Sequence, residues 1–218
     1  MSTSQPVSAR STVKRNARRA VYTPDELRAI LEAQQVCHVA YVEAGEPRQI
    51  ATLYMIDGDH LYLHGNRQAA FLKHLAAGGE ACISVTIVDG VVVARSGFHC
   101  SMNYRSVTVF GCGEAVEGAA HARALDLFVA ALVPGHEQAV REPTPQEMAA
   151  TSVVRVPLTE LAGKVRSGDP IDDEGDLDDD VWAGVIPVAA ETGTPQPSGD
   201  LKADVALPAY VRNFQYRG

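Results

Sequence analysis

The sequence lacks any long run of apolar residues, and its only tryptophan is Trp182. No segment reaches the roughly 18 apolar residues that a membrane-spanning helix needs, so we expect no membrane-embedded helix. The first twenty residues also lack the apolar stretch of a secretory signal. They are rich in Arg and Ser and contain no acid, which leaves a transit peptide open. We therefore expect a cytoplasmic protein that does not interact with membranes.

Cysteines are few, and none belongs to a C-x-x-C pair. The four are Cys37, Cys82, Cys100 and Cys112. Their wide spacing predicts reduced, mostly buried thiols rather than a disulfide framework. No H-x-x-x-H pair and no zinc-ligand spacing with cysteine occurs among His64, His74, His99, His121 and His136, so we expect no metal site. The chain also lacks G-x-S-x-G and the glycine loops of Walker or Rossmann type, which sets those enzyme classes aside.

Positive charge is scarce outside the first twenty residues, which hold five basic residues and no acid. Removing those five from the 19 Lys and Arg leaves 14 basic against 27 acidic residues, a formal charge of −13. Such an acidic body argues against nucleic-acid binding, because phosphates require a basic surface. Residues 169–180 hold eight of the acids and no base, which is typical of a solvated loop.

The length of 218 residues with 46% apolar content allows one sizeable hydrophobic core. We predict a disordered basic tail at 1–20, one folded domain at 21–188, and a linker with a C-terminal tail at 189–218. The last segment is rich in Pro, Gly and Thr between 190 and 203, which favours a linker.

Strand-like segments dominate the domain, and helices interrupt them. Thr23 and Thr144 each begin a capping-box pattern with an acid three residues later, which predicts helix starts. Period-two or β-branched patterns predict strands at 36–43, 49–56, 60–64, 81–88, 91–94, 104–116 and 152–158. Apolar periodicity predicts helices at 23–35, 68–77 and 119–133. Gly111 and Gly113 interrupt one strand, where close backbone approach is expected. The pattern predicts a mainly β, α+β fold: a small antiparallel barrel with helices outside.

One group of polar residues follows the strand at 60–64. His64 and Gly65 close it, and Arg67 and Lys73 follow at the start of a helix. Helix starts carry free N–H groups and a positive dipole end, which suit a phosphate. The alternative is that Arg67 and Lys73 are solvated helix charges and His64 is an ordinary strand-end imidazole.

A second group contains Tyr104, Arg105 and Ser106, where a polar loop enters an apolar strand. Arg105 and Ser106 offer hydrogen bonds to a phosphate or a heterocycle edge, and Tyr104 offers a stacking surface. The alternative is an ordinary strand entry. Trp182 lies between the acidic loop and an apolar run, and it is interpreted as a core or interface anchor or as an aromatic against a bound ring.

Four strings occur in order along the chain: 64–66 (HGN), 97–107 (GFHCSMNYRSV), 164–168 (KVRSG) and 182–187 (WAGVIP). Together they resemble the pyridoxamine 5′-phosphate oxidase-related, flavin-nucleotide-binding proteins, in the branch that includes nitroimidazole-resistance reductases. The resemblance extends from about residue 21 to residue 188.

The resemblance implies a six-stranded split β-barrel that dimerises and holds two FMN molecules between its subunits. It places Thr52 near the polar edge of the flavin ring, and His64 and Gly65 near the ring and ribityl chain. Arg67 and Lys73 would meet the phosphate. Tyr104, Arg105 and Ser106 would complete the pocket, and Trp182 would cap it from the other subunit.

The sequence departs from the family at two adjacent positions. Many relatives carry a Ser-Arg pair where this chain has Ala69 and Ala70, and Arg67 one helical turn away is the expected substitute. Tyr210 and Arg212 are only a loose counterpart of the C-terminal groups that true pyridoxamine phosphate oxidases use.

We predict an FMN-dependent oxidoreductase acting on a small molecule, nitroreductase-like or pyridoxamine-phosphate-oxidase-like. Arg105 is the expected cationic group at the flavin, and His64 the expected catalytic proton source. Three alternatives stay open: a non-catalytic flavin carrier or sensor, a haem protein on the same barrel with His64 or His99 as axial ligand, and a deazaflavin-binding protein.

Overall fold

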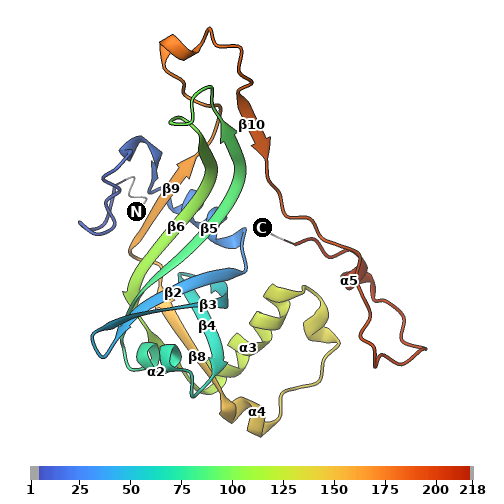
Figure 1. The fold of residues 1–218 in the computed structure, drawn as a ribbon. Helices are drawn as coiled ribbons and strands as arrows, with labels where there is room; N and C mark the ends of the chain where they lie inside the picture. Colours follow the sequence, from blue (N-terminus) through green and yellow to red (C-terminus); the bar gives the residue numbers. More distant parts are fainter. Residues whose placement is uncertain (1–4, 217–218) are drawn as a thin grey trace.

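The structure is a computed structural model, and it describes residues 5–216 (Figure 1). In this part of the chain ten antiparallel strands form one sheet in the order β1-β9-β6-β5-β2-β3-β4-β8-β7, with β10 paired to β5. The strands are β1 (Ala20–Val21), β2 (Val36–Glu43), β3 (Glu46–Asp57), β4 (His60–Asn66), β5 (Glu80–Val93), β6 (Ser101–Cys112), β7 (Glu114–Val116), β8 (Thr151–Pro157), β9 (Leu161–Arg166) and β10 (Gly184–Pro187). The helices are α1 (Pro24–Glu32), α2 (Ala70–Ala76), α3 (Gly118–Leu132), α4 (Pro145–Ala150) and α5 (Ala209–Arg212). The mainly β, α+β class is confirmed.

The hydrogen-bonded path does not close, but the chain itself joins two of its strands. β6 pairs with β5, β7 pairs with β8, and β7 continues directly from β6 after Gly113. The sheet therefore curls around a core while staying split between β6 and β8. The expected count of six strands is wrong for this sheet, because β1, β7, β9 and β10 extend it.

Two glycines make the bend from β6 to β7 possible, as the sequence predicts. A Cβ at Gly111 would lie 2.8 Å from Val156 Cγ1, and a Cβ at Gly113 would lie 2.4 Å from the Leu75 carbonyl oxygen. A side chain at Gly111 would force the Val156 side chain to shift, and one at Gly113 would clash with the backbone of α2. Gly113 N also donates to the Gly79 carbonyl at 3.0 Å, so the bend is bonded to the end of α2.

Helix α1 supplies one wall of the main core. Leu27, Ile30 and Leu31 are its buried residues, spaced three and four apart as an amphipathic helix requires. They belong to the same cluster as fully buried strand residues such as Val39 and Ile83. The Tyr54 hydroxyl donates to the Leu31 carbonyl, which satisfies a polar atom inside this core.

A second, smaller cluster fixes α3 on the sheet. Ala124 and Phe128 of α3 pack with Met55, Val116 and Val153 of the strands. Met55 and Val153 belong to β3 and β8, which both pair with β4. This helix therefore covers the outer side of one half of the sheet and leaves the other half without a helix (Figure 1).

The two predicted capping boxes behave differently. Thr144 Oγ1 accepts a hydrogen bond from Glu147 N at 3.2 Å, and Glu147 Oε2 accepts one from Thr144 N at 2.8 Å, so this box is confirmed. Thr23 precedes α1 without any side-chain cap. The helix begins there nonetheless, with Pro24 in its first turn and its apolar face in the core.

The β2–β3 hairpin turns tightly and extends beyond the rest of the sheet. Glu43 pairs with Glu46 around a two-residue turn in which Ala44 and Gly45 have φ of 52° and 82°. The sequence predicted a longer turn over 44–47, but Pro47 already pairs with Val42 in the ladder. Residues 42–51 are all exposed.

Other strand boundaries also differ from expectation. β5 is continuous where Asp89 and Gly90 predicted a break, and its ladder with β6 only shifts register between Val88 and Gly90. β9 was missed because its sequence LAGKVR contains a glycine and no apolar alternation.

Of the four free cysteines only Cys37 is buried, so the expectation of mostly buried thiols is wrong. Within residues 5–216, no helix combines the length and the apolar character needed to span a membrane.

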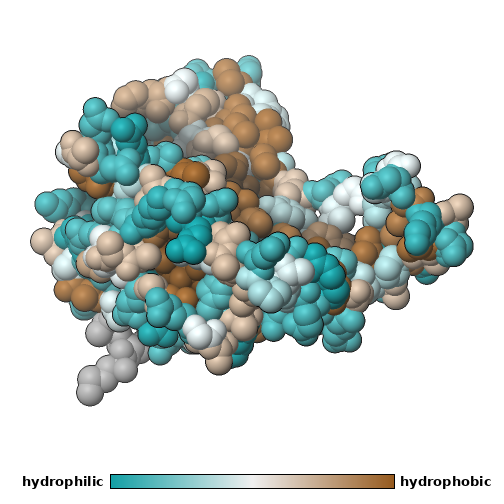
Figure 2. Space-filling model, turned by 90° about the horizontal axis from the view of Figure 1, so that it is seen from below, coloured by the Kyte–Doolittle hydropathy of each residue, from teal (hydrophilic) through white to brown (hydrophobic). Residues whose placement is uncertain are grey.

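The ends of the chain differ in how they contact the sheet. Part of the segment predicted as a disordered tail lies against it: Arg10 binds Glu160 at 2.6 Å and Glu80 at 2.5 Å and lies over the Phe110 ring. The segment after β10 instead runs away from the sheet in an extended path to α5 (Figure 1). Figure 2 shows it projecting from the body, with polar and apolar side chains interspersed.

Candidate functional site

His64 lies in β4 beneath α3. Its ring is 4.0 Å from the Phe128 ring, centroid to centroid. Its Nδ1 atom is buried and has no hydrogen-bond partner among the described residues. Burial lowers the pKa of the imidazole, which favours the neutral form. A neutral imidazole with an unsatisfied nitrogen is a group that can bind a ligand or a metal.

The His64 ring borders a cavity of about 110 Å³ between β3, β4 and α3. Its other lining residues are Gln35, Leu53, Tyr54, Phe128, Val129, Ala131 and Leu132. Apart from the Gln35 amide and the Tyr54 hydroxyl, these side chains are apolar. The sequence singled out His64 but missed these partners, because α3 is far from it along the chain.

The residues after His64 form an exposed edge. Arg67 Nη1 donates to the Ala149 carbonyl at 3.2 Å, and Lys73 Nζ donates to Gln68 Oε1 at 2.6 Å. Both side chains are exposed, and neither forms an ion pair within the described part of the chain. Gly65 is half-buried in β4. Arg67 and Lys73 thus have charge to offer an anion, and their phosphate role stays a prediction.

The predicted group Tyr104, Arg105 and Ser106 is divided between two faces of the sheet. Tyr104 lies opposite Arg166, and Ser106 opposite Lys164. Arg105 lies opposite Ile87, which is buried in the core. Because neighbouring residues of a strand point to opposite faces, Arg105 shares the core face while Tyr104 and Ser106 share the outer one.

Arg105 is already bound to a carboxylate. Its Nε and Nη2 atoms contact both oxygens of Asp89 at 2.7 to 3.1 Å. This hydrogen bonding raises the pKa of the Arg105 guanidinium. The charge that the sequence assigned to a flavin is therefore neutralised within the chain. Thr52 also lies on the core face, opposite the buried Cys37.

α3 does not cover the outer face of β5, β6 and β9. Most side chains on this outer face are polar or small. One row across it runs from Ala51 through His38, Ser84 and Thr108 to Ala162. The next residues along β5, β6 and β9 add Thr86, Ser106 and Lys164. All eight side chains are exposed or half-exposed. This surface is called the open face below, and the hydroxyl groups of Ser84, Thr86, Ser106 and Thr108 lie on it.

A buried cation lies at one edge of the open face. Arg166 is only 6% exposed and lies opposite Tyr104. Its guanidinium donates hydrogen bonds to the Asn103 side-chain oxygen and to the carbonyls of Gly168 and Asp169. None of these acceptors carries a charge. Its Nε atom has no partner among the described residues. An uncompensated buried guanidinium is costly, and an anion bound beside it would offset that cost.

Trp182 does not lie in the core, so the core alternative is wrong. Its side chain is 64% exposed, next to Gly184 at the start of β10. Gly184 pairs with Val93 at the end of β5, and Phe98, which is 90% exposed, lies in the loop that follows. Two large aromatic side chains are thus exposed at this end of the sheet.

One group of metal-type ligands comes together in the structure although the sequence spacing gave no sign of it. His99, Asp173 and Asp176 have ligand atoms within 4.8 Å of one another. His99 Nε2 lies 3.2 Å from Asp173 Oδ2, and the Asp173 side chain is 80% exposed. The contact between His99 and Asp173 accounts for the grouping, and we assign it no ligand.

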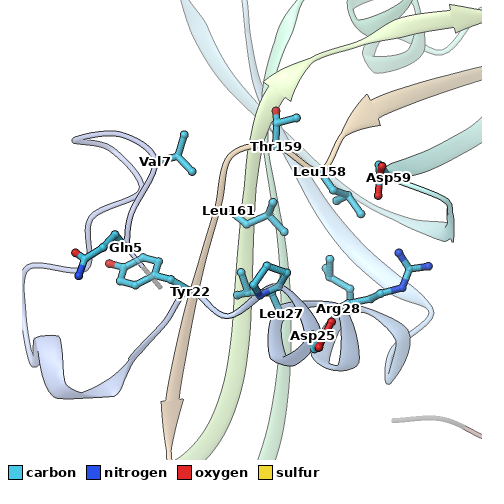
Figure 3. Close-up of a pocket in the computed structure, with 12 residues that line it drawn as sticks. Gln5, Val7, Tyr22, Asp25, Leu27, Arg28, Asp59, Leu158, Thr159 and Leu161 are labelled. Atoms are coloured by element: carbon cyan, nitrogen blue, oxygen red, sulfur yellow. The ribbon is translucent and has the colours of Figure 1, made fainter. Parts of the chain in front are cut away.

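A separate cavity of about 410 Å³ lies between α1, the N-terminal segment and the start of β9. Figure 3 shows Tyr22, Leu27 and Leu161 among its lining side chains, with Arg28 and Asp59 on one side of it. Arg28 is engaged by Glu32 at 2.7 Å and by the Gly58 carbonyl at 2.8 Å. None of the residues singled out from the sequence lines this cavity.

The strands form an antiparallel barrel that does not close. A helix covers the outer side of one half of the barrel, and the outer side of the other half is open and polar. This architecture is a split β-barrel. The family model described as pyridoxamine 5′-phosphate oxidase matches residues 23–165, and the chain belongs to this family. The family predicted from the sequence is confirmed. No curated protein matches the chain.

Two solved structures are similar over almost the whole chain. The flavocytochrome Anf3 from Azotobacter vinelandii is 34% identical, with a TM-score of 0.91 over 95% of this chain and 97% of that one. The FAD and haem binding protein from Mycobacterium smegmatis is 32% identical, with a TM-score of 0.88 over 92% of this chain and 100% of that one. A 5-nitroimidazole antibiotic resistance protein from Bacteroides thetaiotaomicron shares the fold at 20% identity, with a TM-score of 0.56 over 67% and 86% of the two chains.

Proposed function

We propose that this chain is a flavin-binding redox protein. The observation that carries the proposal is its similarity, at 34% and 32% identity over 95% and 92% of its length, to a flavocytochrome and to an FAD and haem binding protein. Similarity of that extent includes the barrel, the open face and the cavity beside His64. An electron-transfer role follows from the flavin, which supplies hydride or electron-pair chemistry when bound.

The open face fits the polar parts of a flavin. Ser106 and Thr86 present hydroxyl groups there, beside the ring of Tyr104. The uncompensated charge of Arg166 and the neighbouring Lys164 suit a phosphate or the electron-rich edge of the ring. We assign Lys164 and Arg166 to cofactor binding in addition to Tyr104 and Ser106, and we keep Arg67 and Lys73 as the alternative phosphate contacts.

The cofactor predicted from the resemblance is FMN, whereas the description of the Mycobacterium relative specifies FAD. Titration of flavin-free protein with each nucleotide, followed by flavin fluorescence, separates the two. The matched variants are Arg166→Met and Arg123→Met, since Arg123 is an exposed cation of α3. We expect Arg166→Met to weaken flavin binding by more than about tenfold, whereas Arg123→Met should not. Equal affinities in both variants would contradict the assignment of Arg166.

A second copy of the chain is the partner that we propose for the open face. The exposed hairpin at 42–51 carries Val42 and Ile50, which are 60% and 40% exposed. Apolar side chains on a protruding hairpin beside an uncovered sheet face are typical of an interface between subunits. In this arrangement the flavin lies between subunits and Trp182 caps it from the partner. Sedimentation of wild type and Val42→Asp tests this: we expect a dimer with flavin and a monomer that loses it.

Haem is a second candidate cofactor. Both relatives with high similarity carry it by their descriptions, one as a flavocytochrome and one as a haem binding protein. The observation in this chain that favours it is His64, whose buried Nδ1 atom has no partner among the described residues and whose ring borders an apolar cavity. A neutral imidazole in apolar surroundings is the chemistry that haem iron binds.

The alternative to an enzyme is a flavin carrier or flavin sensor that catalyses no reaction. Oxidation of NADH or NADPH in the presence of a quinone or a nitroaromatic compound separates an oxidoreductase from such a module. We expect flavin-dependent oxidation of the nicotinamide. The cytoplasmic location and the nature of the small-molecule substrate stay predictions.

A further inference from the structure

The cavity beside His64 is the inner end of a larger hollow. Cavities of about 180 and 420 Å³ adjoin it, and Gln35 and Ala131 line all three. The Gln35 amide donates to the Ala131 carbonyl at 3.0 Å and to the Leu132 carbonyl at 3.2 Å. This half-buried side chain borders the inner cavity and both outer cavities. Rotation of the amide away from the end of α3 would join them into a space of the size that cofactors occupy.

The C-terminal segment 210–216 forms the outer wall of this hollow. Tyr210, Phe214 and Tyr216 line the largest cavity. The Tyr210 hydroxyl bonds to His136 Nδ1 at 3.0 Å, and the Tyr216 hydroxyl donates to Gln34 Oε1 at 2.7 Å. Two tyrosines thus attach an otherwise projecting segment to the end of α3 and to the residues after α1.

We infer that this hollow is the haem site of the chain, with His64 as the axial ligand and segment 210–216 as its outer wall. The inference rests on the haem part of the proposed function. The inner walls are apolar, as a porphyrin ring requires, and the hollow opens toward the polar side chains of Asn213 and Gln215, which suits the propionates.

The other histidines near the hollow or on α2 and α3 are already engaged. His136 is bonded to Tyr210, His121 Nε2 lies 3.0 Å from the Thr151 carbonyl, and His74 Nε2 lies 2.9 Å from the Glu80 carbonyl. His99 lies beside Asp173. The Nε2 atom of His99 is also buried without a hydrogen-bond partner, but His99 lines none of the three cavities. His64 is the histidine that lines the hollow and has a buried nitrogen without a partner among the described residues, so it gains the most from a metal bond.

The test uses the full chain purified with its flavin and titrated with haemin, and the Soret absorption is recorded. The variants are His64→Gly and, as a matched control, His99→Ala. We expect about one haem per chain in wild type and in His99→Ala. In His64→Gly the affinity should fall by more than about tenfold, and added imidazole should restore the wild-type Soret band by occupying the vacated space. Circular dichroism and flavin content confirm that the variant is folded.

The outcomes separate the inference from the proposals on which it rests. If wild type retains flavin but takes up no haem, the haem candidate and this site both fail, and the flavin proposal stands. If His64→Gly binds haem with unchanged affinity and Soret band, haem binding stands but the site is wrong. If His64→Gly loses flavin and imidazole restores nothing, His64 belongs to the flavin site instead.

A second variant tests the outer wall. Ending the chain after Leu207 removes Tyr210 and Tyr216 but leaves His64 in place. We expect the haem to transfer to apomyoglobin more than about tenfold faster, with the Soret band of the bound state unchanged. Transfer at the wild-type rate would overturn the role of the segment.

Discussion

Arg105 and Asp89 form a bidentate ion pair at the point where the β5–β6 ladder shifts register. The Arg105 Nη2–Asp89 Oδ1 distance is 2.7 Å, and the two side chains are 37% and 34% exposed. The carboxylate that neutralises Arg105 comes from the tight Asp89-Gly90 pair that the sequence suggested would end a strand. The geometry therefore favours a structural role for Arg105 over the flavin-tuning role expected from the resemblance.

This ion pair predicts strong coupling in a double-mutant cycle. Arg105→Ala should lower the free energy of unfolding by about 1–2 kcal/mol, between the values for exposed and buried pairs, because it leaves Asp89 unpaired. Asp89→Ala in the Arg105→Ala background should cost little more. Urea unfolding of the two single variants and the double variant measures this. Additive effects, or a shift in flavin potential without loss of stability, would restore the tuning role.

The bend between β6 and β7 predicts that Gly113 cannot be replaced. Gly113→Ala places a Cβ against the Leu75 carbonyl, and we expect a loss of about 1–3 kcal/mol as the bend shifts away from α2. Gly175→Ala is the control, because a Cβ there meets no atom within 4 Å. Thermal unfolding compares the two. Equal melting temperatures would mean that the bend adjusts without cost.

The thiols should differ in reactivity. Burial raises the pKa of the Cys37 thiol to about 12, so it stays protonated and shielded. Cys100 and Cys112 are exposed. Titration with a disulfide reagent at pH 8 should therefore modify Cys100 and Cys112 rapidly, the half-buried Cys82 more slowly, and Cys37 only after denaturation. A Cys100→Ser/Cys112→Ser variant should lack the rapid phase. Rapid modification of Cys37 in the folded protein would contradict the described core.

The capping box of α4 predicts a dependence on pH. Hydrogen bonds from Arg141 and from the Thr144 backbone lower the pKa of Glu147 to about 2. Because the folded value lies below the unfolded one of about 4.3, the contribution to stability is present above the unfolded value and is lost as pH falls toward 2. Glu147→Gln should therefore lower the melting temperature at pH 7 and leave it unchanged near pH 2. The same difference at both pH values would contradict a role for the charge.

Local patterns in the sequence were sufficient to predict most of the helices and strands. Strand β2 was predicted with its observed bounds, and α3 within one residue at each end, because alternation and helical periodicity were uninterrupted there. β9 was missed because Gly163 and Lys164 break the alternation; its pairing with β6 and β1 forms it. Strands at the edge of a sheet depend on partners that are distant in the chain, so local patterns do not predict them.

The candidate site was predictable only in part. The sequence singled out His64, Tyr104 and Ser106, but it treated Tyr104, Arg105 and Ser106 as one group although strand alternation separates them. It gave Arg166 no role, because burial of a cation without a counter-charge is visible only in three dimensions. The partners of His64 were not predictable for a related reason: Phe128 lies 64 residues further along the chain and contacts His64 only in the folded protein.

Chromophore analysis of the freshly purified protein shows whether this chain binds a flavin. The absorption spectrum is recorded first, and the flavin released by heat is then identified by chromatography and counted per chain. We expect a flavin spectrum with about one flavin per chain, bleached by dithionite and restored by air. A colourless protein that also fails to bind added FMN and FAD would contradict it, and the open face would then belong to another ligand.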